Sequence, residues 1–349
     1  SPRRADPRHR GRYPMTLLAP VTEGTDSPRT LKRSAGLPDR VFRGLARGSG
    51  GVVLSIMLLV GTFLGYRAWE ALRVAKGSFI TVPAWEPDSR HFGIAAVLTG
   101  TVLIGLVAIA LAVPLAMGAA LYTSEYAPRG IRRTMISVID LMAAVPSVVY
   151  GLWGAFFLQS HIVGLSRWIS TYFSWIPFFK VNGADPGDPL ATSTVYTSST
   201  FIAGIVVALM VTPIACSVMR ETFSQAPVGE REGAYALGST RWGVIRTVVL
   251  PFGKGGAIGG TMLGLGRALG ETIAVYMIIS PSFVIQPRIL ENGTNSVSSL
   301  IALRYGSASD FGMSALMAAG LALFLMTLVV NFVASSIVAR SRSGAGTDA

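Results

Sequence analysis

The chain has 349 residues, of which 51% are hydrophobic and 14% charged, a composition that excludes an ordinary soluble domain and favours a membrane protein. Its formal net charge is +12, but the Lys and Arg residues gather in alternate loops, which argues against a nucleic-acid partner. The single cysteine, Cys216, excludes an intramolecular disulfide, and the three scattered histidines (His9, His91 and His161) predict neither a metal site nor a catalytic cluster.

The N-terminal segment is polar and basic. Residues 1–49 are rich in Arg, Pro, Gly, Ser and Thr, and eleven of the thirty Lys and Arg residues lie before residue 50. This composition predicts a disordered cytoplasmic tail. Two interpretations stay open: Met15 is the true start site, or the whole tail is genuine and is attracted to anionic lipid headgroups.

Six apolar stretches follow, each long enough to cross a bilayer as a helix, since lipid offers no hydrogen-bond partners to an open strand. They cover about 51–71, 93–121, 134–158, 200–219, 256–280 and 313–338. The sequence therefore predicts an all-α membrane protein with six transmembrane helices. Its membrane domain covers 50–339, and a short cytoplasmic tail follows at 340–349.

Basic residues predict the orientation of these helices. They recur between spans two and three, between spans four and five, and after span six (Arg129, Arg132, Arg133, Arg231, Arg241, Arg246, Lys254, Arg340 and Arg342). The positive-inside rule places these loops and both termini in the cytoplasm. The opposite loops, 72–92, 159–199 and 281–312, are predicted to face outward and contain most of the interfacial aromatic residues.

Span three contains polar residues around a proline. Asp140 is a lone carboxylate early in the span, and Pro146 near its middle frees a backbone carbonyl one turn earlier. Kinked or broken helices line cavities in transporters, where Ser147 and Tyr150 would present hydroxyls. The alternative is a simple proline kink with small residues packed around it. Arg220, at the cytoplasmic end of span four, is either a gate residue or an end charge that extends to the interface.

The segment 220–254 is polar, charged and punctuated by glycine and proline. We expect two short helices joined at Gly238, which would adopt a left-handed cap, with the second helix stopping at Pro251. Tyr235, Ala236 and Leu237 would form an apolar tip, and Glu232 would offer a charge to a partner. The alternative is an amphipathic loop lying on the membrane surface.

Span five contains the sequence Gly-Leu-Gly-Arg-Ala-Leu-Gly-Glu-Thr at 264–272. On a continuous helix, the four-residue spacing of Arg267 and Glu271 puts both on one face, and charges at this depth are costly unless they face protein or water. We predict that Arg267 attracts an anion, with Glu271 and Thr272 beside the path; a structural ion pair is the alternative. Glycines every fourth residue predict close helix packing.

Three stretches together carry a resemblance. They are Ser124–Pro128 with Ala143–Gly151, Met219–Phe223 with the loop around Glu232 to Pro251, and Gly264–Val275. The loop resembles the EAA loop of ABC importer permeases, and the set resembles the membrane subunits of the phosphate ABC importer over about residues 90–340. The ending Gly-Glu-Thr-Ile-Ala-Val at 270–275 is more similar to the PstC-type subunit than to the PstA-type subunit.

The resemblance implies a type I ABC importer permease fold in a bacterial cytoplasmic membrane, with segment 220–254 as the ATPase-coupling loop. Its implied partners are a PstA-type permease, a PstB-type ATPase dimer and an external PstS-type phosphate-binding protein, with phosphate as the solute. No cofactor is expected on this chain, and ATP and Mg would bind the ATPase, because the chain has no Gly-x-x-x-x-Gly-Lys-Ser/Thr motif. It departs from the family at Gly233, usually alanine, at Arg304 and Tyr305, and in its long tail.

Three rival functions remain at this stage. The first is a permease of an importer for another oxyanion, such as molybdate or sulfate, which only the span-three and span-five motifs disfavour. The second is an ATP-independent secondary transporter, although no inverted repeat of broken helices is evident. A membrane enzyme is the least favoured because no catalytic cluster is present in the sequence.

Overall fold

The computed structural model describes residues 37–182 and 193–342. Contacts divide the chain into two units, 1–55 and 56–349. The described part of the first unit, 37–55, is helical and belongs to α1 (Leu37–Ala75). The second unit is also mainly helical in its described part, with one antiparallel sheet of two strands, β1 (Trp85–Glu86) and β2 (His91–Phe92).

Helix α1 begins earlier than the predicted tail boundary. It starts at Leu37, so residues 37–49 are helical rather than part of a disordered tail. Asp39 in the first turn complements the helix dipole and lies 3.4 Å from Arg43, one turn further on. Residues 1–36, which include Met15 and most of the predicted tail, lie outside the described residues.

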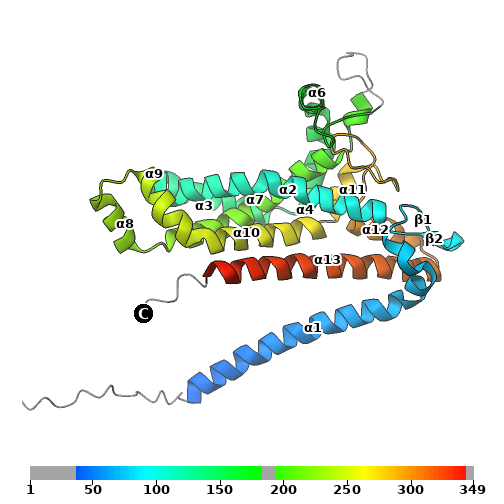
Figure 1. Ribbon diagram of the computed structural model, residues 1–349, viewed down its shortest axis with the longest axis horizontal. Coiled ribbons are helices and arrows are strands. Elements are labelled where there is room, and N and C mark those ends of the chain that lie inside the picture. Colours follow the sequence, from blue (N-terminus) through cyan, green and yellow to red (C-terminus); the bar gives the residue numbers. More distant parts are fainter. Residues whose placement is uncertain (1–36, 183–192, 343–349) are drawn as a thin grey trace, which may run out of the picture. The chain divides into compact units, whose positions relative to one another are not determined.

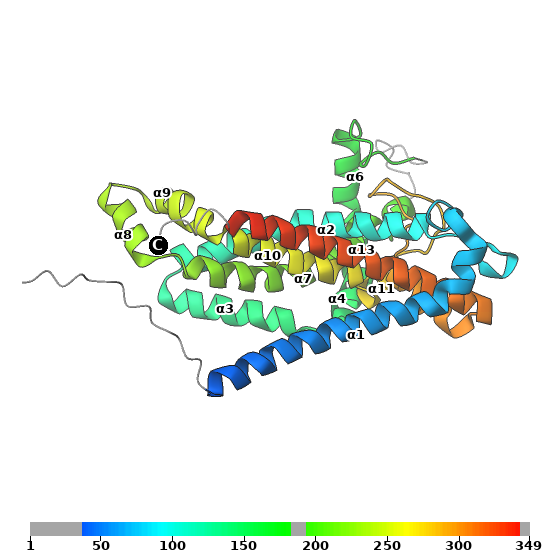
Figure 2. The same cartoon turned by 60° about the horizontal axis from the view of Figure 1, so that its bottom comes forward.

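The centre of the second unit consists of α2 (Ala95–Leu121), α7 (Thr200–Ser224) and α10 (Leu250–Gly270), which lie side by side (Figure 1, Figure 2). Small residues permit this close approach. Gly256, Gly260 and Gly264 of α10 face α7, as their four-residue spacing predicts: a Cβ at Gly264 would lie 2.5 Å from Val211, and one at Gly260 would lie 3.0 Å from the Ala215 carbonyl. Gly266 instead faces Asn331 of α13, and a Cβ at Gly270 would meet no other atom of the described residues within 4 Å.

Helix α13 (Asp310–Arg342) runs along α10 (Figure 1, Figure 2). Within the second unit it also contacts the C-terminal part of α1. The Ser314 hydroxyl donates to the Arg67 carbonyl at 2.8 Å and accepts from the Ala71 amide at 3.2 Å. Ala68, Ala71, Ala315 and Ala319 are fully buried around this contact. Small side chains and one serine therefore join the first and last long helices.

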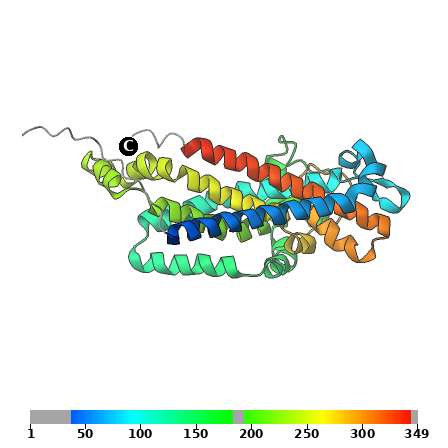
Figure 3. The same cartoon turned by 90° about the horizontal axis from the view of Figure 1, so that it is seen from below.

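The remaining helices connect and cover these long ones. They are η1 (Lys76–Ile80), η2 (Pro87–Ser89), η3 (Tyr122–Tyr126), α3 (Arg129–Ala144), α4 (Ser147–Trp153), η4 (Gly154–Leu158), α5 (Gln159–His161), α6 (Val163–Tyr172), η5 (Ser193–Tyr196), α8 (Val228–Ala236), α9 (Arg241–Val244), η6 (Ile245–Val249), α11 (Ile273–Ile278), α12 (Val297–Arg304) and η7 (Tyr305–Ser307). Segments η3, η4 and η6 are π-helical. Helices α8 and α9 lie at one end of the bundle, whereas α12 and the two strands lie at the other (Figure 3).

Two predicted spans are interrupted. The stretch 134–158 is not one helix, because α3 and α4 meet at a bend of 90°. Pro146 lacks an amide hydrogen and forces Val145 into an extended conformation (ψ 129°). The stretch 256–280 is not one helix either, since α10 ends at Gly270 and Glu271 is extended (ψ 126°). Five of the described helices are long and apolar enough to cross a membrane, or six if the bent pair counts as one span.

Candidate functional site

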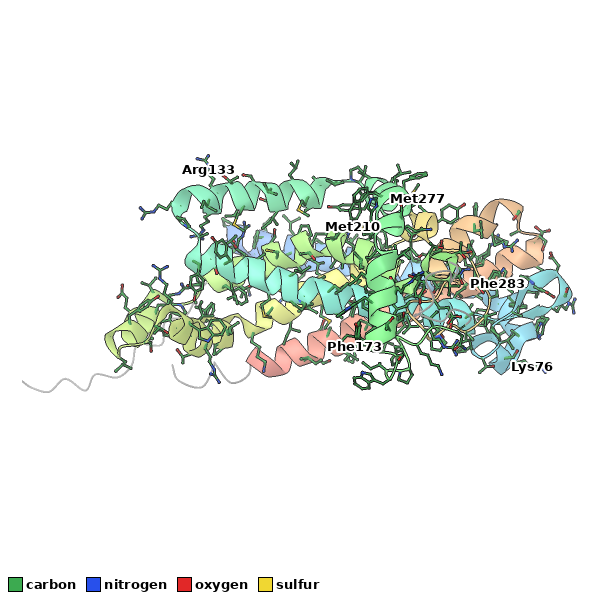
Figure 4. All side chains as sticks on the ribbon, turned by 90° about the horizontal axis from the view of Figure 1, so that it is seen from above. Lys76, Arg133, Phe173, Met210, Met277 and Phe283 are labelled. Carbon is green, nitrogen blue, oxygen red and sulfur yellow. The ribbon has the colours of Figure 1, made fainter. Side chains whose placement is uncertain are left out.

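The two interrupted spans meet at their second halves. Helix α4 packs directly on α11, and glycines make the approach possible: a Cβ at Gly151 would lie 2.9 Å from Ala274 Cα, and one at Gly154 would lie 2.8 Å from Ile278. Met277, labelled in Figure 4, also contacts this face of α4. The break at Pro146 and the break at Glu271 are thereby brought to the same part of the molecule.

Glu271 accepts hydrogen bonds through both its side chain and its backbone carbonyl at the break in span five. Its Oε1 accepts a hydrogen bond of 3.2 Å from the amide of Ala274, which satisfies a free N–H in the first turn of α11. Its backbone carbonyl accepts a hydrogen bond of 2.8 Å from the Ser298 hydroxyl of α12. Glu271 therefore helps to begin a new helix at the place where the sequence predicted a continuous one.

The expected placement of Arg267 and Glu271 on one helix face is wrong, because α10 ends between them at Gly270. No ion pair within 4.0 Å joins the two residues in the described part of the chain. Arg267 lies in the last turn of α10 with its side chain exposed, and interacts electrostatically with the Tyr150 hydroxyl. A guanidinium in an apolar span is left available for a partner other than Glu271.

Both broken spans contain hydroxyl groups close to their breaks. The Tyr150 hydroxyl donates to the Met142 carbonyl at 3.0 Å, which satisfies one of the last acceptors of α3. Thr272 donates to the Gly270 carbonyl at 3.2 Å, and Ser147 begins α4 directly after Pro146. Arg267, Glu271 and Thr272 lie at the break in span five, and Ser147 and Tyr150 lie in α4 just after the break in span three. We call these five residues the central group.

Asp140 and Arg220 form a second group, between α3 and α7. Asp140 Oδ1 accepts a hydrogen bond of 3.4 Å from Ser217, and both Asp140 and Arg220 interact electrostatically with the Cys216 thiol. The Nη1 atom of Arg220 is buried and has no hydrogen-bond partner among the described residues. A buried guanidinium N–H without an acceptor is costly, so this atom favours an anion or an acceptor from another molecule.

The segment 220–254 contains the two short helices joined at Gly238 that the sequence predicted. We call these helices, α8 and α9, and the turn between them the elbow. Helix α8 ends at Ala236, and Gly238 adopts a left-handed conformation (φ +82°), with its amide bonded to the Tyr235 carbonyl at 2.9 Å. Thr240 then begins the next helix, since its hydroxyl accepts from the Gly243 amide at 3.2 Å. The turn chemistry of this loop could therefore be predicted from its residue types.

The tip of the elbow is exposed. Leu237 has 89% of its surface accessible, and Glu232, Tyr235 and Ala236 are exposed as well. The prediction that Pro251 ends the second helix is wrong, because α9, η6 and α10 continue into one another from Arg241 to Gly270. The π turn η6 ends at Val249, and Pro251 follows after Leu250 in the first turn of α10. The wider π turn interrupts the regular α-helical hydrogen bonds next to the residue that cannot donate one.

Sequence reasoning missed two residues. Glu125 belongs to a motif that was singled out, but it was given no role; it forms an ion pair of 2.8 Å with Arg231, which was considered only as a sign of topology. Ser298 was missed altogether, although it contacts the break in span five. A carboxylate at the end of an apolar span, beside a basic loop, was the available signal for Glu125, whereas nothing in the sequence marked Ser298.

An apolar helical bundle with interrupted spans and an exposed helical elbow defines a membrane permease of the ABC importer type. The chain belongs to the family of binding-protein-dependent transport system inner membrane components, whose pattern matches residues 112–343. It is 35% identical over 334 residues to phosphate transport system permease protein PstC 2 of Mycobacterium tuberculosis, covering 93% of this chain and all of that one. It is 38% identical over 306 residues to PstC of Mycobacterium leprae, covering 86% and 92%.

A solved structure supports the fold. The chain is similar to a subunit in the crystal structure of a bacterial alginate ABC transporter in complex with an alginate-bound periplasmic protein. The TM-score is 0.56 at 15% sequence identity, with 86% of this chain and 95% of that chain covered. At this identity the similarity concerns the fold alone.

Proposed function

We propose that this chain is a membrane subunit of an ATP-driven importer and provides part of a path for inorganic phosphate. The observation that carries the proposal is the similarity to phosphate transport permeases over 93% of this chain and the whole length of the relative. An importer for molybdate or sulfate is not favoured, since the similar permeases are those of phosphate transport systems. An ATP-independent transporter is not favoured, because it leaves the exposed elbow without a role.

Positive charge in the apolar spans supports an anionic solute. Arg267 is exposed on α10 near the two breaks, and Arg220 has a buried N–H without an acceptor in the described part of the chain. Charges at bilayer depth are expensive unless they face protein or a wet path. We infer that Arg267 attracts phosphate from the central group, that Arg220 lies on the cytoplasmic part of the path, and that Asp140 and Glu271 limit how tightly the anion binds.

The elbow supports a cytoplasmic ATPase as partner. Leu237, Tyr235 and Ala236 offer an apolar tip, and Glu232 offers a charge for a basic residue of that partner. The assembly that we propose contains a PstA-type permease, a PstB-type ATPase dimer with ATP and Mg, and a PstS-type binding protein outside. ATP binding closes the ATPase pair and turns the path outward, and hydrolysis resets it, so this chain itself needs no catalytic site.

Uptake by the purified complex in proteoliposomes tests the proposal. With the binding protein and ATP present, radiolabelled phosphate should accumulate, and Arg267→Gln should reduce uptake by about tenfold or more, the effect of losing one charged interaction. Arg133→Gln is the control, because Arg133 is also exposed but lies near the start of α3, far from Met277 of α11 (Figure 4). Accumulation of molybdate or sulfate instead of phosphate would contradict the proposal.

A further inference from the structure

Arg231 of α8 joins three elements. Its Nη1 donates to Glu125 Oε2 at 2.8 Å, in the π turn η3 that ends α2, and its Nη2 donates to the Phe223 carbonyl at 2.7 Å, in the last turn of α7. The Phe223 carbonyl also accepts a hydrogen bond of 3.3 Å from the Ala226 amide, so Arg231 adds a charged donor to an acceptor at that helix end. A single side chain of the elbow therefore contacts the cytoplasmic ends of two long helices.

Phe223 extends this connection to a third long helix. Its ring is fully buried and lies against Gly253 of α10, so closely that a Cβ at this glycine would clash with the ring. Together with Met219 and Val249 it forms the hydrophobic cluster beneath the elbow. Packing of this density is rigid, so a displacement of α7 at Phe223 is passed on to α10 rather than absorbed.

Glu125 lies in a π turn that follows α2. The π turn Tyr122–Tyr126 closes with the Ala127 amide bonded to the Tyr122 carbonyl at 2.9 Å, after which the chain becomes extended at Ala127 and Pro128. A π turn contains one more residue than an α turn and is frequent at functional sites. Its conversion to an α turn would change the direction of the Glu125 side chain.

The ion pair orients the elbow more than it stabilises the fold. Only 9% of the Glu125 side chain and 20% of the Arg231 side chain are exposed, so both charges have lost most of their water. Glu125 Oε1 and Arg231 Nε are buried without a hydrogen-bond partner among the described residues. A buried pair with unsatisfied atoms contributes little net stability but defines geometry closely.

We propose that Glu125 and Arg231 are positioning residues that transmit the movement of the elbow to the ends of α2 and α7 during transport. The inference rests on the proposed function insofar as the elbow contacts an ATPase. It goes beyond that function by naming the contact through which the elbow acts on the transmembrane helices. Neither residue touches the solute or ATP in this proposal.

The test is the number of anions taken up per ATP hydrolysed, measured with the assembled complex in proteoliposomes and inorganic phosphate as the probe. Glu125→Gln keeps the shape and one acceptor but removes the charge. It should lower this ratio by about tenfold, the effect of losing one charged hydrogen bond, while the ATPase stays bound and active. Glu221→Gln is the matched control, because Glu221 is exposed near the end of α7 and its carboxylate accepts a hydrogen bond from Gln225, the residue directly after that helix.

Arg231→Gln and the double variant, Glu125→Gln with Arg231→Gln, complete a double-mutant cycle. If the pair acts as a unit, the double variant should be no worse than Arg231→Gln, which also loses the hydrogen bond to the Phe223 carbonyl. An unchanged ratio in Glu125→Gln, additive losses, or loss of the bound ATPase in proportion to uptake would overturn the inference. If the wild type takes up no phosphate, the proposed function fails, and the same ratio is then measured with the sulfate or molybdate that it does carry.

Discussion

The Ser298 hydroxyl donates a hydrogen bond of 2.8 Å to the backbone carbonyl of Glu271. This contact ties the first turn of α12 to the interruption between α10 and α11. The start of α12 is itself well defined, since the Ser296 and Ser299 side chains cap each other's backbone amides. Ser298 thus fixes the backbone at a break that the residues of span five alone would leave free.

Removal of this hydroxyl should loosen the break. Ser298→Ala leaves the Glu271 carbonyl without its donor, and we expect a loss of about 1–2 kcal/mol in the free energy of unfolding. The thermal midpoint of the purified complex measures this loss. Ser336→Ala is the control, because that hydroxyl bonds to Phe332 of its own helix and should leave the midpoint unchanged. Equal midpoints for both variants would contradict the role of Ser298.

A second prediction concerns the contact between α2 and the segment before α12. A Cβ at Gly100 would clash with the carbonyl of Asn295, a backbone atom that cannot move aside, and the neighbouring Thr101 hydroxyl accepts from the Val297 amide at 3.0 Å. Gly100→Ala should therefore cost about 3 kcal/mol through overpacking. Gly118→Ala in the same helix meets open space and should be neutral or stabilising, by up to about 1 kcal/mol.

Thermal unfolding of the two glycine variants compares them directly. Gly100→Ala should unfold at a clearly lower temperature than the wild type, whereas Gly118→Ala should not. A wild-type midpoint for Gly100→Ala would show that the segment at 294–299 does not pack on α2 as described.

The elbow offers another pair of glycines. Gly238 has φ +82°, where an alanine is strained by about 1–2 kcal/mol. Gly233 lies inside α8 without a close neighbour, so alanine there should strengthen the helix by about 1 kcal/mol. We expect Gly238→Ala to reduce both the amount of copurified ATPase and uptake, and Gly233→Ala to maintain both. Full activity of Gly238→Ala would show that the turn geometry does not matter for coupling.

Local chemistry explains which features could be predicted. The left-handed turn at Gly238 and the cap at Thr240 depend on residues within a few positions, so the sequence sufficed. The packing face of the α10 glycines followed from their four-residue spacing. Both are properties of one element and need no knowledge of its neighbours.

Features that depend on other elements could not be predicted. The end of α10 at Gly270 lies inside an apolar run, and it becomes favourable because Glu271 caps α11 and Ser298 binds its carbonyl. The passage of the helix through Pro251 depends on the π turn before it, which has no clear sequence signal. Pro146 predicted a kink in span three, but the bend angle of 90° depends on the packing of α4 against α11.

The orientation of the bent pair α3–α4 can be tested by thiol labelling. If the pair crosses the membrane once, cysteines in Arg133→Cys and Ser174→Cys lie on opposite sides, and both positions are exposed. A membrane-impermeant label should then reach position 174 in intact cells and position 133 only after permeabilisation. The native Cys216 is buried and provides a low background. Labelling of both positions in intact cells would mean that the pair is re-entrant.

The final prediction concerns Arg267 and Glu271. These two residues have different roles in a structural ion pair and in an anion path. The structure removes the simplest form of the ion-pair interpretation, because the two residues lie on either side of a helix end. The swapped protein combines Arg267→Glu with Glu271→Arg. An arginine at position 271 cannot accept a hydrogen bond from the Ala274 amide, so α11 loses its cap. We therefore expect that the swap does not restore phosphate uptake, which should be at least as low as in Arg267→Gln.

Glu271→Gln separates the cap from the charge. Its amide oxygen can still accept from Ala274, so the complex should assemble and its thermal midpoint should fall by less than in Glu271→Ala. If the carboxylate limits how tightly an anion is held near Arg267, the half-saturating concentration for phosphate should fall, and the maximal rate should fall with it because release becomes slower. Unchanged kinetics in Glu271→Gln, with a lowered midpoint only in Glu271→Ala, would make Glu271 a helix cap and leave Arg267 to act on the anion alone.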